Sequence, residues 1–320
     1  MHDICDVVHG QKRKLMELNQ LEAFIAVAQA RSFSAAAKVL KCTQPAVSQT
    51  VRKLEEELGE SLFDRSSRDG TLTQAGTVLL DYAHKLLNLR GEARASLVEL
   101  RQAQRGVLSI AANEFTSLYL VRALDDFRRF FPAIRIAVQR AFASRVQQLI
   151  MDHTVELGML AFRPEDPKLR SIVVYRDELA FVVHPAHPLA RASQVSIRQL
   201  GAESFVAHNV ASPYRVKVLE AFKRHKTRLN MDVELPTLEA IKKFVALGNG
   251  VALLPAISVE AEISRGELVR IPVRELKVER RLRIVYRKGS SLSHAARALL
   301  KTAEALSERR GSSYLFQPES

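Results

Sequence analysis

Residues 32–76, SFSAAAKVLKCTQPAVSQTVRKLEEELGESLFDRSSRDGTLTQAG, decide the fold of the N-terminal part of the chain. A short helix, AAAKVL, is expected after a cap at Ser34. A polar break then leads into a helix over Gln44–Leu58, which is expected to end at Gly59. The pattern predicts a short helix, a tight turn and a longer helix.

One more helix is predicted on the N-terminal side of this stretch. Asn19 is its expected N-cap, and it is expected to end near Arg31. Residues 1–17 show no clear periodicity, so we interpret them as a loose leader of no assigned function. The ordered chain is therefore expected to begin with three helices.

The helix over Gln44–Leu58 has two chemically different faces. An apolar stripe, which must face a core, consists of Val47, Val51, Leu54 and Leu58. On the opposite face, serine and glutamine can read base edges, while arginine and lysine hold phosphates. A solvated polar face on a surface helix is the alternative interpretation. The polar face consists of Gln44, Pro45, Ser48, Gln49, Arg52 and Lys53.

The residues after Gly59 are expected to form a small wing. Leu62, Phe63 and Leu72 can pack on the core, with a polar turn between short extended pieces. A basic turn tip can lie along a phosphate backbone or enter a minor groove, although arginines in a turn are often only solvated. The tip residues expected to contact DNA are Arg65, Ser66 and Arg68.

Five short motifs in this stretch carry a resemblance to a known family. S-x-A-A-x-x-L, Q-P-A-V-S, L-E-x-x-L-G, L-F-x-R and L-T-x-A-G are all present in order. Residues 18–75 therefore resemble the winged helix-turn-helix of LysR-type transcriptional regulators. Where the family often has arginine, this chain has Gln49, so the base that this position reads stays open. The resemblance implies base-reading or groove-facing roles for Gln44, Pro45, Ser48 and Gln49, and backbone or minor-groove contacts for Ser34, Arg52, Arg65 and Arg68.

Thr73 is the predicted cap of a long helix that reaches about Gln104. Its apolar residues repeat at heptad spacing, which is typical of a seam that pairs with a partner helix. Packing on its own domain is the alternative for such a helix. The resemblance implies that residues 76–105 are a linker helix that pairs two subunits within a dimer or tetramer. The predicted dimerisation residues are Leu79, Tyr82, Leu86, Leu89, Ala93 and Leu100.

Beyond Gly106 the hydrophobic pattern changes to short strands that alternate with helices. This alternation predicts a parallel sheet with helices on both faces. The resemblance implies a two-lobed, periplasmic-binding-protein-like effector domain over residues 106–320, with one lobe from 106–177 and 269–306 and the other from 178–268. The expected fold is multidomain, with an N-terminal all-α winged helix-turn-helix and long linker helix, and a C-terminal α/β two-lobed domain.

Polar side chains follow several expected strands or open expected helices. Hydroxyl groups and free backbone N–H groups at helix N-termini form an anion-binding arrangement. Arg215 would add a bidentate ion pair with a carboxylate. The alternative is that these residues only cap helices, as Ser144 is expected to do for the helix after the second strand. The predicted effector-binding residues are Asn113, Thr116, Ser117, Ser144, Ser212, Tyr214, Arg215 and Thr237.

Composition excludes several other classes of protein. Cys5 and Cys42 lie far apart, so no disulfide framework is indicated and a reducing cytoplasm is the expected compartment. No apolar run is long enough to span a bilayer or to serve as a signal peptide. Tryptophan is absent and only 6% of residues are aromatic, which favours duplex DNA over single-stranded nucleic acid as a partner.

An enzyme or a metalloprotein is the competing class. His184, His187 and His208 have no cysteine or acidic partner at metal-ligand spacing. Cys42 lies in the turn of the DNA-binding unit, where we interpret it as a small filler residue. We therefore expect no enzymatic activity, metal or cofactor. A small-molecule-binding protein, or an enzyme on an α/β scaffold without DNA affinity, is the alternative function.

The formal net charge of +13 invites a polyanionic partner. Residues 1–105 hold 15 basic and 13 acidic residues, whereas 106–320 hold 33 and 22, so most of the surplus lies outside the DNA-binding unit. We interpret it as a sign of an anionic effector, or of DNA running alongside the assembly. The expected function is a cytoplasmic, sequence-specific DNA-binding regulator, an activator or a repressor. It would read an inverted repeat as a dimer or tetramer, affect RNA polymerase and respond to a small metabolite.

Overall fold

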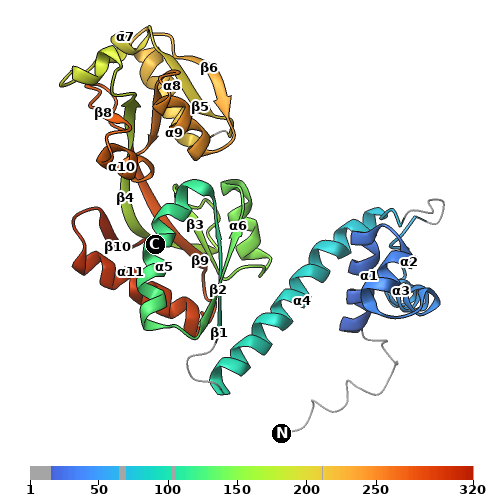
Figure 1. Cartoon of the computed structure of the whole chain (residues 1–320). Helices are drawn as coiled ribbons and strands as arrows, with labels where there is room; N and C mark the ends of the chain where they lie inside the picture. Colours follow the sequence, from blue (N-terminus) through green and yellow to red (C-terminus); the bar gives the residue numbers. More distant parts are fainter. Residues whose placement is uncertain (1–15, 65–69, 102–105, 211, 320) are drawn as a thin grey trace. The chain divides into compact units, whose positions relative to one another are not determined.

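The computed structural model of the chain describes residues 16–64, 70–101, 106–210 and 212–319. These residues divide near Leu97 into two compact units (Figure 1). None of the described helices is long and apolar enough to cross a membrane.

The N-terminal unit is built from helices around one core. Three short helices, α1 (Leu18–Ala30), α2 (Phe33–Leu40) and α3 (Gln44–Leu58), precede the long helix α4 (Gln74–Arg101). An antiparallel bridge between Phe63 and Leu72 closes the base of the predicted wing. The core of this unit includes the buried side chains of Leu21, Phe24, Val51, Leu54, Leu62 and Phe63.

Several of the predicted helix boundaries in this unit are confirmed, including the end of α1 at Arg31 and the range of α3. Gly59 is the C-cap of α3 and has a φ of 73°, a left-handed conformation that glycine adopts without a steric penalty. The hydroxyl of Thr73 accepts the backbone N–H of Gly76 at 3.0 Å, so Thr73 caps α4 as predicted. These caps fix where the recognition helix ends and where the long helix begins.

The predicted caps of the first two helices are wrong. Glu17 rather than Asn19 precedes α1, and it forms a reciprocal capping box with the third residue of that helix. Ser32 rather than Ser34 caps α2, because Arg31 ends α1 in a left-handed conformation and leaves Ser32 extended. Each helix therefore begins two residues earlier than predicted.

The second unit consists of two α/β lobes. The sheet of the first lobe has the strand order β10-β4-β9-β3-β1-β2. β1 is parallel to β2 and β3, whereas β4, β9 and β10 pair antiparallel, so the sheet is mixed rather than wholly parallel as predicted. Its elements are β1 (Gly106–Ala112), α5 (Glu114–Phe130), β2 (Ile134–Arg140), α6 (Ala143–Met151), β3 (Leu157–Leu160), the first half of β4 (Leu169–Val183), β9 (Glu279–Arg287), α11 (His294–Arg309) and β10 (Tyr314–Glu319).

The second lobe is built on the other half of β4. That half pairs antiparallel with β7 and β8, while β5 and β6 form a separate parallel pair. Its elements are η1 (Pro188–Arg191), α7 (Ile197–Leu200), β5 (Ser204–His208), α8 (Pro213–Arg224), β6 (Asn230–Leu235), α9 (Leu238–Ala246), β7 (Ala252–Pro255), α10 (Ala256–Ser264) and β8 (Val269–Ile271). Neither α10 nor β10 was predicted from the sequence.

The boundary between the lobes differs from the expected one. Val273, Leu276 and Val278 pack in the core of the second lobe, although residues from 269 onward were expected in the first. The chain therefore returns to the first lobe near Glu279, where β9 begins, and not near Leu268. β8 holds the intervening segment in the second lobe because it pairs with the far end of β4.

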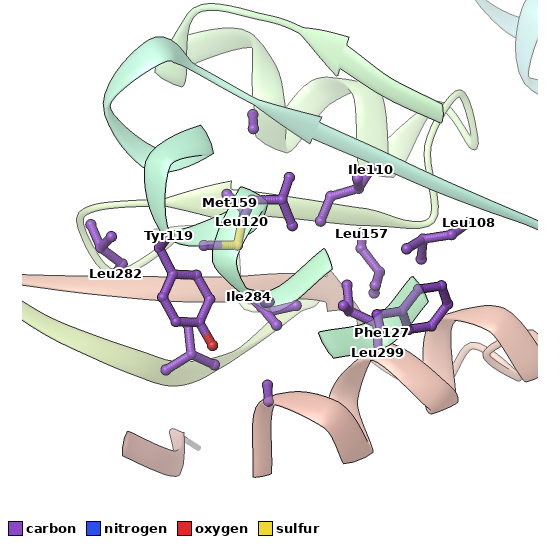
Figure 2. Packing of buried hydrophobic residues seen from close by; sticks show 14 of the residues in the cluster. Leu108, Ile110, Tyr119, Leu120, Phe127, Leu157, Met159, Leu282, Ile284 and Leu299 are labelled. Carbon is purple, nitrogen blue, oxygen red and sulfur yellow. The ribbon is translucent and has the colours of Figure 1, made fainter. Parts of the chain in front are cut away.

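The core of the first lobe forms where α5 and α11 cover the sheet. Figure 2 shows Tyr119 and Phe127 of α5 and Leu299 of α11 close to sheet residues such as Met159 and Ile284. All five side chains are fully buried. Because burial of each large apolar side chain stabilises a fold by about 1.5 to 3 kcal/mol, this core stabilises the sheet whose strand β4 continues into the second lobe.

Gly76 is a position where the fold tolerates no side chain. A Cβ atom there would lie 2.1 Å from the carbonyl oxygen of Leu62. We predict that Gly76→Ala destabilises the N-terminal unit by about 3 kcal/mol, because the backbone of α4 must move away from the wing. Chemical unfolding followed by circular dichroism measures the loss.

Gly91→Ala is the matched control, since Gly91 lies in the same helix and a Cβ atom there meets nothing within 4 Å. In this control the free energy of unfolding should rise by about 0.5 to 1 kcal/mol, because alanine has a higher helix propensity than glycine. Equal effects of the two substitutions would contradict the role of Gly76.

Candidate nucleic-acid interface and inter-lobe cavity

The two faces of α3 are separated as the sequence predicts, with one exception. Val47, Val51 and Leu54 are buried, whereas Leu58, expected in the same stripe, is 40% exposed. Leu58 is the last residue of α3, and the chain turns away at Gly59 before the core can cover it. All six residues of the predicted polar face are exposed: Gln44, Pro45, Ser48, Gln49, Arg52 and Lys53.

The polar face of α3 keeps its cations available to a partner. The guanidinium of Arg52 forms an ion pair with Glu56 at 3.1 Å, and its side chain is 75% exposed. An exposed pair one helical turn apart contributes only about 0.3 to 0.5 kcal/mol, so a phosphate can replace the glutamate at little cost. Thr43 caps the N-terminus of this helix, and Ser34 is exposed in the first turn of α2.

Two further predictions for this unit concern the wing tip and Cys42. The wing-tip residues Arg65, Ser66 and Arg68 lie outside the described residues. Cys42 is exposed in the tight turn before α3, so the interpretation of this residue as a small filler is wrong.

The exposed apolar stripe of α4 differs in part from the predicted heptad seam. Leu79 is half-buried and packs on the core of its own unit, so it does not belong to the exposed stripe. The helix has 3.6 residues per turn, and a strict seven-residue repeat therefore drifts around it by about 20° per heptad. The side chain of Leu100 lies outside the described part of the chain. The exposed stripe consists of Val78, Tyr82, Leu86, Leu89, Ala93 and Leu97.

A cavity of about 770 Å³ lies between the two lobes of the second unit. The predicted residues Thr116, Ser117 and Thr237 do not line it. Each of these hydroxyls forms hydrogen bonds within its own helix terminus, as the alternative interpretation expected. The predicted residues that line the cavity are Asn113, Ser144, Ser212, Tyr214 and Arg215.

Several of the lining side chains already have partners. Asn113 and Ser212 cap α5 and α8 through their side-chain oxygens, and the guanidinium of Arg215 binds Glu234 at 3.0 Å. The expected cap at Ser144 is wrong, because this residue is the second of α6 and the Phe142 carbonyl accepts the first backbone hydrogen bond. These residues therefore shape the cavity wall more than they offer free polar groups.

Glu114 is a site residue that the sequence analysis missed. Its carboxylate comes from the first lobe and accepts the backbone N–H of Leu238 at 2.8 Å, at the N-terminus of α9 in the second lobe. The other carboxylate oxygen lies 3.3 Å from Nε2 of His208. A negative charge at a helix N-terminus is favourable, so Glu114 ties the lobes together. The hydroxyl of Tyr214 makes a second link when it donates to the carbonyl of Ala161.

A buried ion pair lies at the inner wall of the cavity. Nη1 of Arg280 is 2.5 Å from the Asp177 carboxylate, and the two residues are 3% and 5% exposed. Burial raises the pKa of Asp177, and the attraction of Arg280 offsets part of that effect. The guanidinium lies 5.1 Å from the centre of the Tyr214 ring and 5.9 Å from that of Phe115.

The three histidines considered as metal ligands have other contacts. Nδ1 of His184 accepts the N–H of Ala186, and Nδ1 of His187 accepts that of Leu189. Within the described ranges, no group of three or more histidine, cysteine or acidic side chains is placed to hold a metal ion. Their local hydrogen bonds assign His184 and His187 to the turn after β4.

Two protein families and several known proteins match the chain. Residues 101–307 match the family described as LysR substrate binding domain, and residues 18–77 match Bacterial regulatory helix-turn-helix protein, lysR family. The chain is 31% identical to the "Probable RuBisCO transcriptional regulator" of Synechocystis sp. over 291 residues, which cover 89% of this chain and 84% of that protein.

Two solved structures are similar in fold. Full-length CbnR in complex with its target DNA has a TM-score of 0.70 and 22% identity, and the match covers 91% of this chain and 99% of CbnR. The regulatory domain of Synechocystis PCC6803 CcmR in complex with 2-PG has a TM-score of 0.59 and 24% identity, and covers 64% of this chain and 99% of that domain.

We predict that Asp177→Asn destabilises the second unit by about 3 to 5 kcal/mol, because it leaves the buried charge of Arg280 without a partner. The asparagine keeps an oxygen for the backbone N–H of Ile257, which Asp177 accepts at 3.2 Å. Thermal and chemical unfolding of the full chain measure the change.

Asp125→Asn is the control, since it removes the same charge from an exposed pair with Arg129 on α5. This substitution should change the free energy of unfolding by no more than about 0.5 kcal/mol. A loss at Asp177 no larger than at Asp125 would show that the buried pair does not hold the lobes.

Proposed function

We propose a mode of action from the premise that this chain belongs to the LysR family of bacterial regulatory helix-turn-helix proteins. The chain is a DNA-binding transcriptional regulator with a domain for a small-molecule effector. In our proposal, α3 reads one half of an inverted-repeat operator, and an anionic metabolite between the lobes controls how paired units meet DNA. The exposed polar face of α3 is the observation that carries the proposal.

The exposed side chains of α3 support two kinds of DNA contact at different positions along the helix. Gln44, Ser48 and Gln49 offer hydrogen-bond donors and acceptors that suit base edges. Arg52 and Lys53 lie one turn further along the helix and suit phosphates. Ser34 and the wing-tip arginines Arg65 and Arg68 would add backbone or minor-groove contacts.

The effector would act through the relative position of the two lobes. Asn113, Ser144, Ser212, Tyr214 and Arg215 line the cavity and are proposed to surround the ligand. A ligand that binds one lobe arrangement more tightly shifts the population toward it. That shift would change the angle between the DNA-binding units of an oligomer, and so the bend of the DNA and the access of RNA polymerase. The complex of the CcmR domain with 2-PG supports a small molecule as the ligand of such a domain.

We further propose that two copies of the chain pair through α4. Its exposed apolar stripe includes Tyr82, which is 60% exposed, and Leu89, which is 47% exposed. A partner helix would bury this stripe, and the resulting dimer would present two α3 helices to one palindromic site. Association of two such dimers would give a tetramer.

Two further points are the cellular compartment in which the protein acts and its lack of enzymatic activity. We propose that the protein acts in the cytoplasm, where its DNA target and RNA polymerase are found, and that it has no enzymatic activity. The regulatory role of the similar Synechocystis protein supports the second point. Whether binding activates or represses transcription depends on the position of the operator relative to the promoter.

Replacing Gln44 and Arg52 together with alanine tests the DNA-binding face. We predict a loss of about 2 kcal/mol or more in affinity for the region upstream of its own gene, and a salt slope reduced by about one, because one base contact and one phosphate contact are removed. Gel shifts at several salt concentrations measure both quantities.

Arg129→Ala serves as the control, because Arg129 is an exposed arginine of α5 in the other unit. It should leave affinity unchanged. Absence of a sequence-dependent complex at low salt, or full affinity of the double variant, would refute the proposed face.

Leu86→Glu with Leu89→Glu tests the oligomer. Two charges in the centre of the seam should prevent pairing through α4, so we predict that sedimentation gives half the native mass while circular dichroism stays unchanged. Gln74→Glu, which adds a carboxylate at the exposed start of the same helix, should leave the native mass unaltered. An unchanged mass of the double variant would place the subunit interface elsewhere.

A further inference from the structure

The wall of the inter-lobe cavity is predominantly apolar. Aromatic and aliphatic side chains come from both lobes and from strands as well as helices, and the polar residues form a minority of the lining. Cavities of about 300 to 1,000 Å³ with such walls hold ligands that carry a substantial apolar body. The apolar part of the wall includes Phe142, Phe162, Phe205, Val218, Leu229 and Met231.

The charges on this wall are largely neutralised by the protein itself. Arg280 is paired with Asp177, and Arg215 is paired with Glu234. Glu114 accepts a backbone hydrogen bond and lies beside His208, as described above. Arg280, which is buried together with its partner, supplies little additional attraction for a ligand, and Arg215 would first have to release Glu234.

Arg140 is the exception among the cations of the wall. It ends β2, lines the cavity and is exposed, and it has no acidic partner among the described residues. Its position at the end of a strand places one uncompensated positive charge beside Phe142 and Ser144. A single carboxylate would balance that charge, whereas a ligand with several negative charges would leave some of them facing apolar walls at a high desolvation cost.

We infer that the effector is an amphipathic monoanion: an organic acid with one carboxylate and an apolar ring-bearing or branched body. The carboxylate pairs with Arg140, and the body lies against the aromatic and aliphatic wall. This assignment rests on the proposed function of the cavity as the effector site, and it narrows the broad class of anionic metabolites to one kind. A compact acid of two or three carbons, or a sugar phosphate, would leave the apolar wall in contact with water.

The test uses the full chain and matched probes. A panel of aryl and alicyclic monocarboxylates of increasing size, beginning with 3-phenylpropionate, is compared with the corresponding amides, with propionate and with glycerol 3-phosphate at equal ionic strength. Thermal shift and calorimetry measure binding. We expect at least one acid of the panel to raise Tm and to bind roughly tenfold or more tightly than its amide, because the amide lacks the charge-assisted contact. Propionate and glycerol 3-phosphate should give no shift.

Three variants connect this selectivity to the wall. Arg140→Gln should lower the affinity for the acid by roughly tenfold or more and leave the affinity for the amide unchanged. Phe142 is 63% exposed, so Phe142→Ser should not impair folding. This variant should lower the affinity for the acid and for the amide to a similar extent. Arg145→Gln removes the same charge from an exposed residue of α6 that does not line the cavity, and should change neither affinity.

Two kinds of result would overturn the inference. One is the absence of binding by every acid of the panel, or binding of the small polar anions instead. The other is equal affinity for acid and amide, or an unaltered preference in Arg140→Gln. Gel shifts on the same samples report DNA binding, so a failure of the ligand assignment is distinguished from a failure of the proposed regulator.

Discussion

A single strand, β4, runs through both lobes of the second unit, and the arrangement of the whole unit depends on it. Its first half pairs with β9 and β10, and its second half with β7 and β8. Where the strand passes between the lobes, Asp177 lies opposite Arg280 in the β4–β9 register. Because neither charge can lose the other without remaining buried and unpaired, the pair fixes that register and with it the inner wall of the cavity.

Two further contacts between the lobes involve residues that line the cavity. Glu114 reaches the N-terminus of α9 with a partly exposed carboxylate, and Tyr214 reaches the carbonyl of Ala161. Glu114, Tyr214 and Arg280 all line the cavity, whereas Asp177 does not. In our proposal, the buried pair keeps the crossing strands together, while the partly exposed contacts at the cavity change with the angle between the lobes.

Local patterns predicted the helices of the N-terminal unit and several of their boundaries, because these depend on residues close in sequence, although the predicted caps of α1 and α2 lie two residues too late. Gly59, Thr73 and the buried stripe of α3 are examples, while Leu58 fails only where the chain turns. The second unit depends on contacts distant in sequence. The first half of β4 was missed because its run of buried residues shows no alternation, and Glu114 was missed because its partner Leu238 is 124 positions away.

Charge placement explains why net charge is a poor guide to the binding surfaces of this chain. The segment from Ser34 to Thr73 holds six basic and six acidic residues, yet the acids do not cancel the basic face of α3. Glu55 accepts the backbone N–H of Leu62 at 2.7 Å, and Glu57 receives a hydrogen bond from a side chain of α1. These carboxylates thus serve the interior of the unit, while Arg52 and Lys53 remain exposed. In our proposal, a segment with no net charge therefore still offers Arg52 and Lys53 to DNA, since two of its carboxylates are bound within the unit.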